Sequence, residues 1–284
     1  MKQYSGRRLV LGMLPKRILS RLMGGLSKTK IPSGLRRKLY GAFARRYGVD
    51  MDELDRELED FTSFAEFFGR PLREGARPIS ASEDTLVSPV DGRLVAAEDI
   101  EADRMLLVKG NPHSASELAA GLPDAERFAS GQQLTLYLAP GDYHRIHAPI
   151  EGTLTHWSHV PGTLFPVNDK AFGCIPGLFA RNERVSLAID SERFGRLALI
   201  AVGAFNVGSI IVPMLPQLQS NAAGSKPSSG AFPEALPITR GQEIAKFGFG
   251  STVVLLLEQR IALDSTLIDT QLRCGTALGR SLTS

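Results

Sequence analysis

Short apolar segments separated by Gly and Pro restrict the chain from about residue 85 onward to a β-rich fold. Each segment is a few residues long, which suits strands better than helices. The expected strands cover residues 94–97, 105–109, 134–138, 185–189, 197–202, 210–213 and 252–257. One short helix, over residues 115–121, is expected among them. The pattern predicts an α+β protein with a mainly antiparallel β body, folded as a sandwich or flattened barrel and preceded by N-terminal amphipathic helices.

The charge is distributed very unevenly along the 284 residues. The net charge is only +3, but residues 1–49 contain 13 Lys and Arg and no Asp or Glu. The rest of the chain contains 20 basic and 30 acidic residues. A basic arm on an acidic body favours phosphate-rich partners, either nucleic acid or anionic lipid.

The apolar pattern of this arm favours lipid over nucleic acid. A first helical face begins after Pro15, and a second follows in residues 35–47, each interleaved with Lys and Arg. The apolar positions are Ile18, Leu19, Leu22, Met23, Leu26, Leu35, Leu39, Phe43 and Tyr47. Basic amphipathic helices of this kind lie in the membrane interface. Two alternatives stay open, namely a helix packed on the body with a solvated basic face and an organellar targeting peptide.

Two further segments have their own expectations. Residues 50–70 are predicted to form a helix, with Asp50 as its cap and Glu53 at capping-box distance. Residues 215–240 are rich in Pro, Ser, Gly and Ala and are predicted to be a mobile loop, either a surface insertion or a lid. Cys174 and Cys274 show no metal-type spacing and indicate a reducing compartment. No apolar run is long enough for a membrane-spanning helix.

The bond between Gly250 and Ser251 precedes a buried-looking strand and is a candidate for self-cleavage. Such a reaction needs a base for the serine hydroxyl, a carboxylate that orients the base, and a small residue before the serine. His147 can be the base, Asp91 its partner, and Gly250 the small residue. Attack of Ser251 on the Gly250 carbonyl gives an ester, elimination releases the upstream chain, and loss of ammonia leaves a pyruvoyl group.

Each of these residues is a weak signal alone, but their surroundings are more specific. Seven segments, in this order and spacing, carry the pattern: 88–92 (SPVDG), 137–149 (YLAPGDYHRIHAP), 161–168 (PGTLFPVN), 178–184 (LFARNER), 202–204 (VGA), 207–210 (VGSI) and 250–252 (GST). Together they resemble the phosphatidylserine decarboxylase family, of the bacterial membrane-bound type. The resemblance covers roughly residues 60–258. One departure is Phe249, where the family commonly has Leu.

The resemblance implies a pyruvoyl-dependent carboxy-lyase that is made from a proenzyme. Asp91, His147 and Ser251 match the family's self-processing triad, and His144 matches the histidine assigned to decarboxylation. The covalent pyruvoyl group at Ser251 would form a Schiff base with phosphatidylserine, and phosphatidylethanolamine and carbon dioxide would be the products.

The same resemblance implies the organisation of the mature protein. Residues 1–250 would become the β chain and residues 251–284 the α chain, which stay together as a heterodimer; a further dimer of such pairs stays open. Residues 1–70 would be the basic membrane-associating region and residues 71–284 the catalytic domain. The protein would be peripheral on the cytoplasmic face of a bacterial inner membrane, with an organellar copy left open.

Three rival functions remain at this stage. Asp91, His144 and His147 could instead bind zinc in a metal-dependent hydrolase. Ser251 could serve a serine hydrolase without cleavage, or the chain could be a non-catalytic lipid-binding scaffold. The remaining histidines, His113, His156 and His159, are taken as structural.

The spacing of His144 and His147 carries one structural expectation. On a regular strand these two side chains would point to opposite faces. On a turn or helical segment both could face one pocket, and we predict such a non-strand conformation there.

Overall fold

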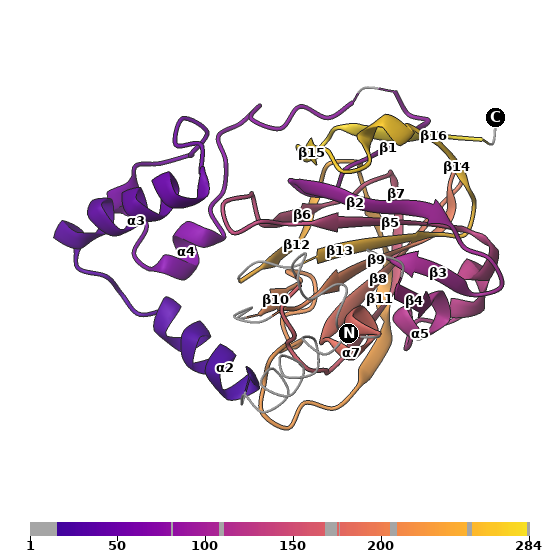
Figure 1. Ribbon diagram of the computed structural model, residues 1–284, viewed down its shortest axis with the longest axis horizontal. Helices are drawn as coiled ribbons and strands as arrows, with labels where there is room; N and C mark the ends of the chain where they lie inside the picture. Colours follow the sequence, from indigo (N-terminus) through magenta and orange to yellow (C-terminus); the bar gives the residue numbers. More distant parts are fainter. Residues whose placement is uncertain are drawn as a thin grey trace, which may run out of the picture.

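An eight-stranded antiparallel sheet forms the centre of the molecule, in the strand order β11-β7-β8-β9-β13-β5-β2-β15 (Figure 1). The computed structural model describes residues 16–80, 82–107, 111–167, 175, 177–204, 209–248 and 252–282. The eight strands are β2 (Gly92–Asp99), β5 (Gln132–Tyr137), β7 (Gly152–Val160), β8 (Arg184–Ser191), β9 (Gly195–Val202), β11 (Ser228–Ile238), β13 (Thr252–Leu257) and β15 (Gln271–Leu272).

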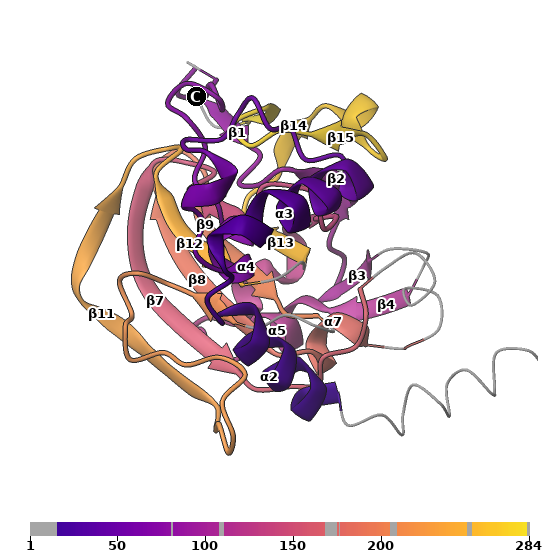
Figure 2. The same cartoon turned by 90° about the vertical axis from the view of Figure 1, so that its left-hand side faces the viewer.

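Three smaller antiparallel sheets complete the β structure. They have the strand orders β1-β16-β14, β10-β12-β6 and β3-β4. Their strands are β1 (Thr85–Val87), β3 (Arg104–Leu107), β4 (Asn111–Ser114), β6 (Arg145–His147), β10 (Ile210–Ile211), β12 (Glu243–Phe247), β14 (Ile261–Leu263) and β16 (Ala277–Ser281). The strong curvature of the large sheet is seen in Figure 2.

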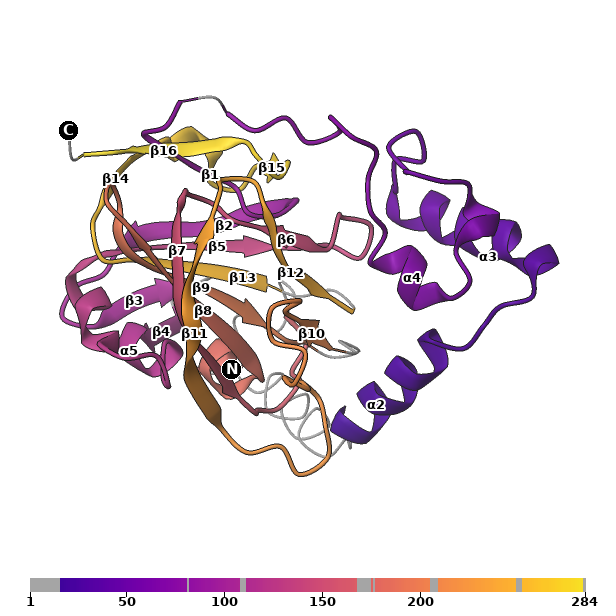
Figure 3. The same ribbon diagram turned by 180° about the vertical axis from the view of Figure 1, so that it is seen from behind.

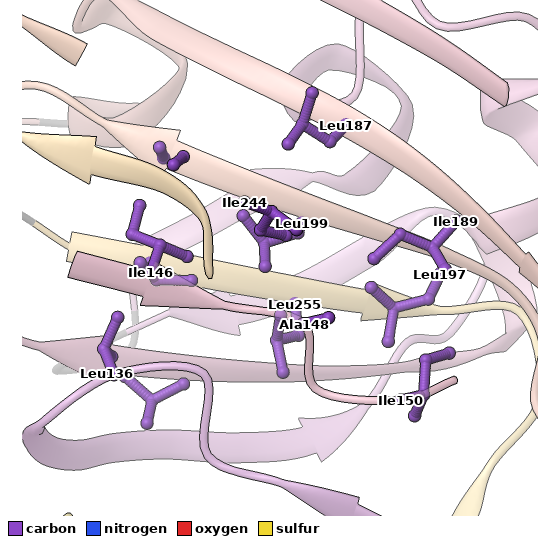
Figure 4. Close-up of a cluster of buried hydrophobic side chains, with 14 of the residues drawn as sticks. Leu136, Ile146, Ala148, Ile150, Leu187, Ile189, Leu197, Leu199, Ile244 and Leu255 are labelled. Atoms are coloured by element: carbon purple, nitrogen blue, oxygen red, sulfur yellow. The ribbon is translucent and has the colours of Figure 1, made fainter. Parts of the chain in front are cut away.

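The central strands of the large sheet are buried on both faces, and β13 shows how. Val253, Leu255 and Leu257 enter one apolar cluster, which also holds residues of β6, β10, β12 and β16. Val254 and Leu256 enter a second cluster on the other face, against α5, α7 and η3. Figure 4 shows part of the first cluster, where Ile146 and Ile244 lie near Leu199 and Leu255. This arrangement confirms the predicted α+β class with its mainly antiparallel body.

The N-terminal helices lie together at one end of the β body, near β6, β10 and β12 (Figures 1 and 3). The helices of the described chain are α2 (Lys16–Ser27), α3 (Ser33–Tyr47), α4 (Phe64–Phe68), α5 (Ala115–Leu118) and α7 (Leu178–Arg181), with 3-10 turns η1 (Leu58–Asp60), η3 (Ala125–Ser130) and η4 (Ser265–Leu267). The two helices predicted from the basic arm are therefore present. No helix in the described part of the chain is long and apolar enough to cross a membrane.

Helix α3 is held to the protein by one face only. Tyr40 is fully buried, stacks on the Phe67 ring at 4.7 Å between centroids, and donates a hydrogen bond to the Phe61 carbonyl at 3.0 Å. The helix ends at Gly48, whose φ of 72° is a left-handed conformation that glycine adopts without strain. The opposite face remains in solvent, as does one side of α2.

The helix predicted over residues 50–70 is wrong. Only η1 and α4 form there, and Ser63 caps α4 by accepting a hydrogen bond from the Glu66 backbone. Glu53, which was expected on this helix, instead forms ion pairs with Arg77 at 2.9 Å and with Arg273 at 2.8 Å.

The prediction of a loop over residues 215–240 is wrong for its second half. Strand β11 occupies Ser228–Ile238 and pairs with β7, with a bulge between Ala231 and Leu236. It is an edge strand, where proline and exposed polar residues are tolerated, so it lacks the apolar alternation that marks a strand in sequence.

Candidate functional site

The predicted cleavage segment lies between β12 and β13. Phe249, Gly250 and Ser251 themselves lie outside the described residues, as does Cys174. On the upstream side, the Gly248 amide donates to the Ser209 carbonyl at 2.6 Å. On the downstream side, Thr252 is fully buried and starts the central strand. The two residues that flank the segment are thus held by the body.

His144 comes directly before β6 and is fully buried. Its Nδ1 donates to the Asp142 carbonyl at 2.7 Å, and the centroid of its ring lies 4.1 Å from the centroid of the Phe68 ring. Burial, and secondarily the nearby Arg70, lower the pKa of His144 to about 3. The imidazole is therefore neutral at pH 7. Its Nε2 has no hydrogen-bond partner among the described residues, so a lone pair is available there.

His147 is the last residue of β6, and both of its ring nitrogens are occupied. Nδ1 donates to the Gly241 carbonyl at 2.7 Å, which fixes the tautomer. Nε2 therefore accepts from the Tyr143 hydroxyl, 3.0 Å away. Burial lowers the pKa of His147 below its ordinary value, so this side chain is also held neutral. A neutral imidazole with a basic Nε2 is what a general base requires.

Asp91 lies at the turn between β1 and β2. A side chain at the next residue, Gly92, would place its Cβ 2.6 Å from the Tyr137 carbonyl oxygen, so the turn needs glycine there. The Asp91 carboxylate accepts two hydrogen bonds from Arg77, at 2.8 and 2.5 Å, and one from the Cys274 amide at 2.8 Å. All three donors stabilise the charged carboxylate.

The fold brings Asp91 and His147 close but does not join them directly. The His147 amide donates to the Pro89 carbonyl at 2.8 Å, which places the Asp91 turn beside β6. In the described residues, however, the Asp91 carboxylate bonds Arg77 and not the His147 ring. The Arg77 guanidinium lies over the Tyr143 ring, 5.7 Å from its centroid. The contact between the two residues therefore runs through Arg77 and Tyr143.

The expected non-strand conformation is wrong for residues 145–147 and right only for His144, which precedes the strand. Residues 145–147 form β6, because β12 offers backbone partners along that segment. His144 lies just outside the strand, and the two rings consequently have different surroundings. One backbone bond links His144 to the cleavage flank, since its carbonyl accepts from the Phe247 amide at 2.9 Å.

Arg77 and Tyr143 are site residues that the sequence analysis did not single out. Tyr143 falls within the quoted segment 137–149, next to His144, so its position was a signal. Arg77 lies 14 residues before Asp91 and gave no signal of its own. The histidines taken as structural lie elsewhere, His113 on β4 and both His156 and His159 on β7.

The alternative of a metal-dependent hydrolase would need Asp91, His144 and His147 to lie close enough together to bind one zinc ion. No group of three or more His, Cys, Asp or Glu side chains suited to a metal was found among the described residues. No observation therefore favours that alternative over the one carried by residues 88–92, 137–149 and 250–252.

The comparisons with known proteins agree with one another. A family model described as phosphatidylserine decarboxylase matches residues 64–280. The chain belongs to the phosphatidylserine decarboxylase family. The match includes the positions of Asp91, His144, His147 and Ser251, and it confirms the family predicted from the seven segments.

Curated relatives cover almost the whole chain. A phosphatidylserine decarboxylase proenzyme from Anaeromyxobacter sp. (strain K) is 41% identical over 272 residues, which are 95% of this chain and 96% of the relative. A second, from Pseudoalteromonas translucida (strain TAC 125), is 40% identical over 94% of each protein. A third, from Myxococcus xanthus (strain DK1622), is 36% identical over 91% of each.

Proposed function

We propose that this protein decarboxylates phosphatidylserine to phosphatidylethanolamine and carbon dioxide, after its own chain is cut between Gly250 and Ser251. The observation that carries the proposal is the family match over residues 64–280, which spans every residue of the candidate site. The curated relatives are named proenzymes, which supports maturation by cleavage.

His147 is the base that takes the proton of the Ser251 hydroxyl in this proposal. Its neutral state and its fixed tautomer favour that role. Tyr143, which now occupies Nε2, must give way to the serine hydroxyl. Asp91 supports His147 indirectly, since it holds Arg77 over the Tyr143 ring. The triad of Asp91, His147 and Ser251 therefore acts with Arg77 and Tyr143 as positioning residues.

The described residues suit a pyruvoyl group formed from Ser251. Thr252, directly after Ser251, is fully buried at the start of β13. The buried Nε2 of His144 has no hydrogen-bond partner among the described residues, and a bound substrate could supply one. When formed, the pyruvoyl group supplies a ketone that takes the substrate amine and accepts the electrons left by carbon dioxide. His144 is the proposed proton donor to carbon. Because the His144 imidazole is neutral at pH 7, it must first acquire that proton from the substrate or solvent.

The membrane association of residues 1–49 is part of the proposal. Leu22 and Leu26 on α2 are 64% and 67% exposed, and Leu35 and Leu39 on α3 are 51% and 49% exposed. Exposed leucines on basic helices favour an anionic membrane surface. Residues 1–70 would hold the catalytic region, residues 71–284, at the cytoplasmic face of the cell membrane. The mature protein would be a heterodimer of the β chain, 1–250, and the α chain, 251–284.

An intact mass measurement on purified wild-type protein and Ser251→Ala tests the cleavage step. Wild type should give two chains divided after Gly250, the smaller one lighter by one ammonia than a peptide beginning with serine. Ser251→Ala should remain whole. Formation of phosphatidylethanolamine from phosphatidylserine vesicles then tests the activity. A single uncut wild-type chain without this product would contradict the proposal.

A further inference from the structure

Two basic residues are paired across β6 and β12, close to Gly248, the last described residue before the predicted cleavage segment. Arg145 is directly opposite Lys246, and Ile211 of β10 is opposite Lys246 on its other side. Directly opposed residues share one face of a sheet, and His147 shares it too because it lies two residues from Arg145. Phe247 points the other way, into the core.

This pair of like charges is only partly compensated. Opposed like charges destabilise a sheet unless an anion neutralises them. Arg145 pairs with Glu243 at 2.7 Å and donates to the Gly69 carbonyl at 3.1 Å. For Lys246, no carboxylate within the described ranges lies at ion-pair distance. The face therefore keeps an excess of positive charge beside His147.

A pocket of about 380 Å³ opens on this face, between the strands and the helices α2 and α4. Its lining has four basic residues, Lys28, Arg56, Arg145 and Lys246, against one acidic residue, Glu66. Arg56 and Arg145 are already paired, with Glu66 and Glu243 respectively. Within the part of the chain that the structure describes, Lys28 and Lys246 have no ion-pair partner, which leaves them for a ligand.

The pocket adjoins the reacting segment. Gly248 lines it, and Ser251 follows three residues later in the chain. A larger pocket of about 520 Å³ exists on α3, but its lining residues include none that flank the cleavage segment. Charge and position, rather than volume, single out the smaller pocket.

We propose that this pocket binds the phosphodiester of the lipid substrate's headgroup, with Lys246 and Lys28 as its ligands. The inference rests on the proposed function. In phosphatidylserine, the phosphate is only a few covalent bonds from the amine that reacts, so its binding site must adjoin the reacting segment. Lysine binds phosphate as a point charge, which suits a mobile lipid headgroup. Helix α2 borders the pocket and exposes Leu22 and Leu26, so a membrane bound by these leucines would lie close to the pocket.

The kinetics of Lys246→Gln test this assignment. The substrate is short-chain dihexanoyl phosphatidylserine below its micelle concentration, which removes any contribution of membrane binding. Cleavage of each variant is verified by mass before it is assayed. Loss of a charge-assisted contact should raise KM about tenfold or more, with a smaller change in kcat. Lys246→Arg should restore most of the binding.

Lys226→Gln is the matched control, because Lys226 is exposed and absent from the pocket lining. It should behave as wild type. A KM for Lys246→Gln within twofold of wild type would overturn the inference while leaving the decarboxylase intact. If the wild type itself does not act on phosphatidylserine, the proposed function fails instead.

Inorganic phosphate distinguishes a headgroup site from a site for free anions. Competitive inhibition by phosphate should weaken in Lys246→Gln in parallel with the rise in KM. Weaker phosphate inhibition with an unchanged lipid KM would overturn the assignment to substrate. Should Lys246→Gln remain uncleaved, calorimetric binding of glycerophosphoserine to the Ser251→Ala proenzyme, with and without Lys246→Gln, decides the same question. Equal affinities would contradict the proposal.

Discussion

His144 is a fully buried imidazole whose neutrality has a measurable cost in acid. Its pKa is about 3 in the folded protein against an ordinary value near 6.5, so the unfolded chain binds one more proton between these values. The stability it contributes is complete above about pH 6.5 and is lost as the pH falls toward 3. We expect the free energy of unfolding to decline in that window, by up to about 1.4 kcal/mol per pH unit from this group.

Urea unfolding of the Ser251→Ala proenzyme between pH 7 and pH 4 measures this slope. Other groups titrate in the same window, so His144→Gln in the same background is the necessary comparison. Its amide can still donate to the Asp142 carbonyl, and the variant should lose the slope that belongs to one proton. Equal slopes in the two proteins would show that His144 is not held neutral.

His147 is expected to control self-cleavage. His147→Gln removes the basic nitrogen and should slow appearance of the two chains by about 100- to 10,000-fold, as for loss of a general base. Because burial lowers the pKa of His147, the wild-type cleavage rate should be constant above about pH 6.5 and fall only in more acidic solution. His156→Gln, on β7, is the matched control and should be cleaved normally. Normal cleavage of His147→Gln would remove it from the mechanism.

At the scale of elements, the strands that sequence predicts best are those buried on both faces. The expected strand over 252–257 coincides with β13, because a short apolar run bounded by turn signals admits few other structures. β11 escaped notice because its stability comes from pairing with β7 along an edge, which leaves no apolar pattern. No continuous helix forms over residues 50–70, where Glu53 instead pairs with Arg77 and Arg273, partners that lie outside that segment and that a local pattern does not show.

Some residues of the candidate site could be predicted from the sequence, and others could not. Asp91, His144 and His147 lie in segments whose local pattern identifies them. The contacts that complete the site join distant parts of the chain, such as Arg77 with Asp91 and His147 with Gly241. Local periodicity and turn chemistry carry no information on such pairs, so only the folded structure reveals them.

Helices α2 and α3 should bind membranes through their exposed leucines. Leu22→Glu combined with Leu26→Glu removes two apolar side chains, each contributing about 1.5–3 kcal/mol on full burial, so partition onto vesicles should fall about 100-fold or more. Sedimentation with vesicles of phosphatidylglycerol and phosphatidylcholine measures this. Leu282→Glu is the control, because Leu282 is 68% exposed yet lies near the C-terminus. Equal partition of both variants would contradict membrane binding by α2.

At the scale of the whole molecule, Arg77 connects three regions of the chain. It pairs with Glu53, which lies between α3 and α4, and with Asp91 in the body, and Asp91 accepts a hydrogen bond from the Cys274 amide near the C-terminus. The Arg77 side chain is only 10% exposed, so Arg77→Gln leaves the buried Asp91 carboxylate without a cation and leaves Glu53 with only the more exposed Arg273. We expect a loss of about 3–5 kcal/mol in the unfolding free energy of the Ser251→Ala proenzyme.

Arg127→Gln provides the contrast in the same urea experiment. Arg127 also pairs with a carboxylate, that of Glu258 at 2.7 Å, but its side chain is 44% exposed. Loss of a surface pair should cost about 0–1 kcal/mol. Equal effects of the two substitutions would show that the Arg77 network does not stabilise the fold.

After the proposed cleavage, the two chains should remain together because β13 lies in the middle of the large sheet. It pairs with β5 on one side and β9 on the other, and Val253 to Leu257 are fully buried. Each such side chain contributes about 1.5–3 kcal/mol. The ion pair of Arg273 with Glu53 adds little, because the Arg273 side chain is 58% exposed.

Salt and urea therefore act differently on the cleaved protein. In 1 M NaCl, where charges are screened within about 3 Å, the two chains should still elute together from a size-exclusion column. Urea should separate them only in the transition that unfolds the whole molecule, because removal of β13 would divide the sheet and open both apolar clusters. Release of the fragment 251–284 by salt alone would mean that ion pairs, rather than the central strand, join the chains.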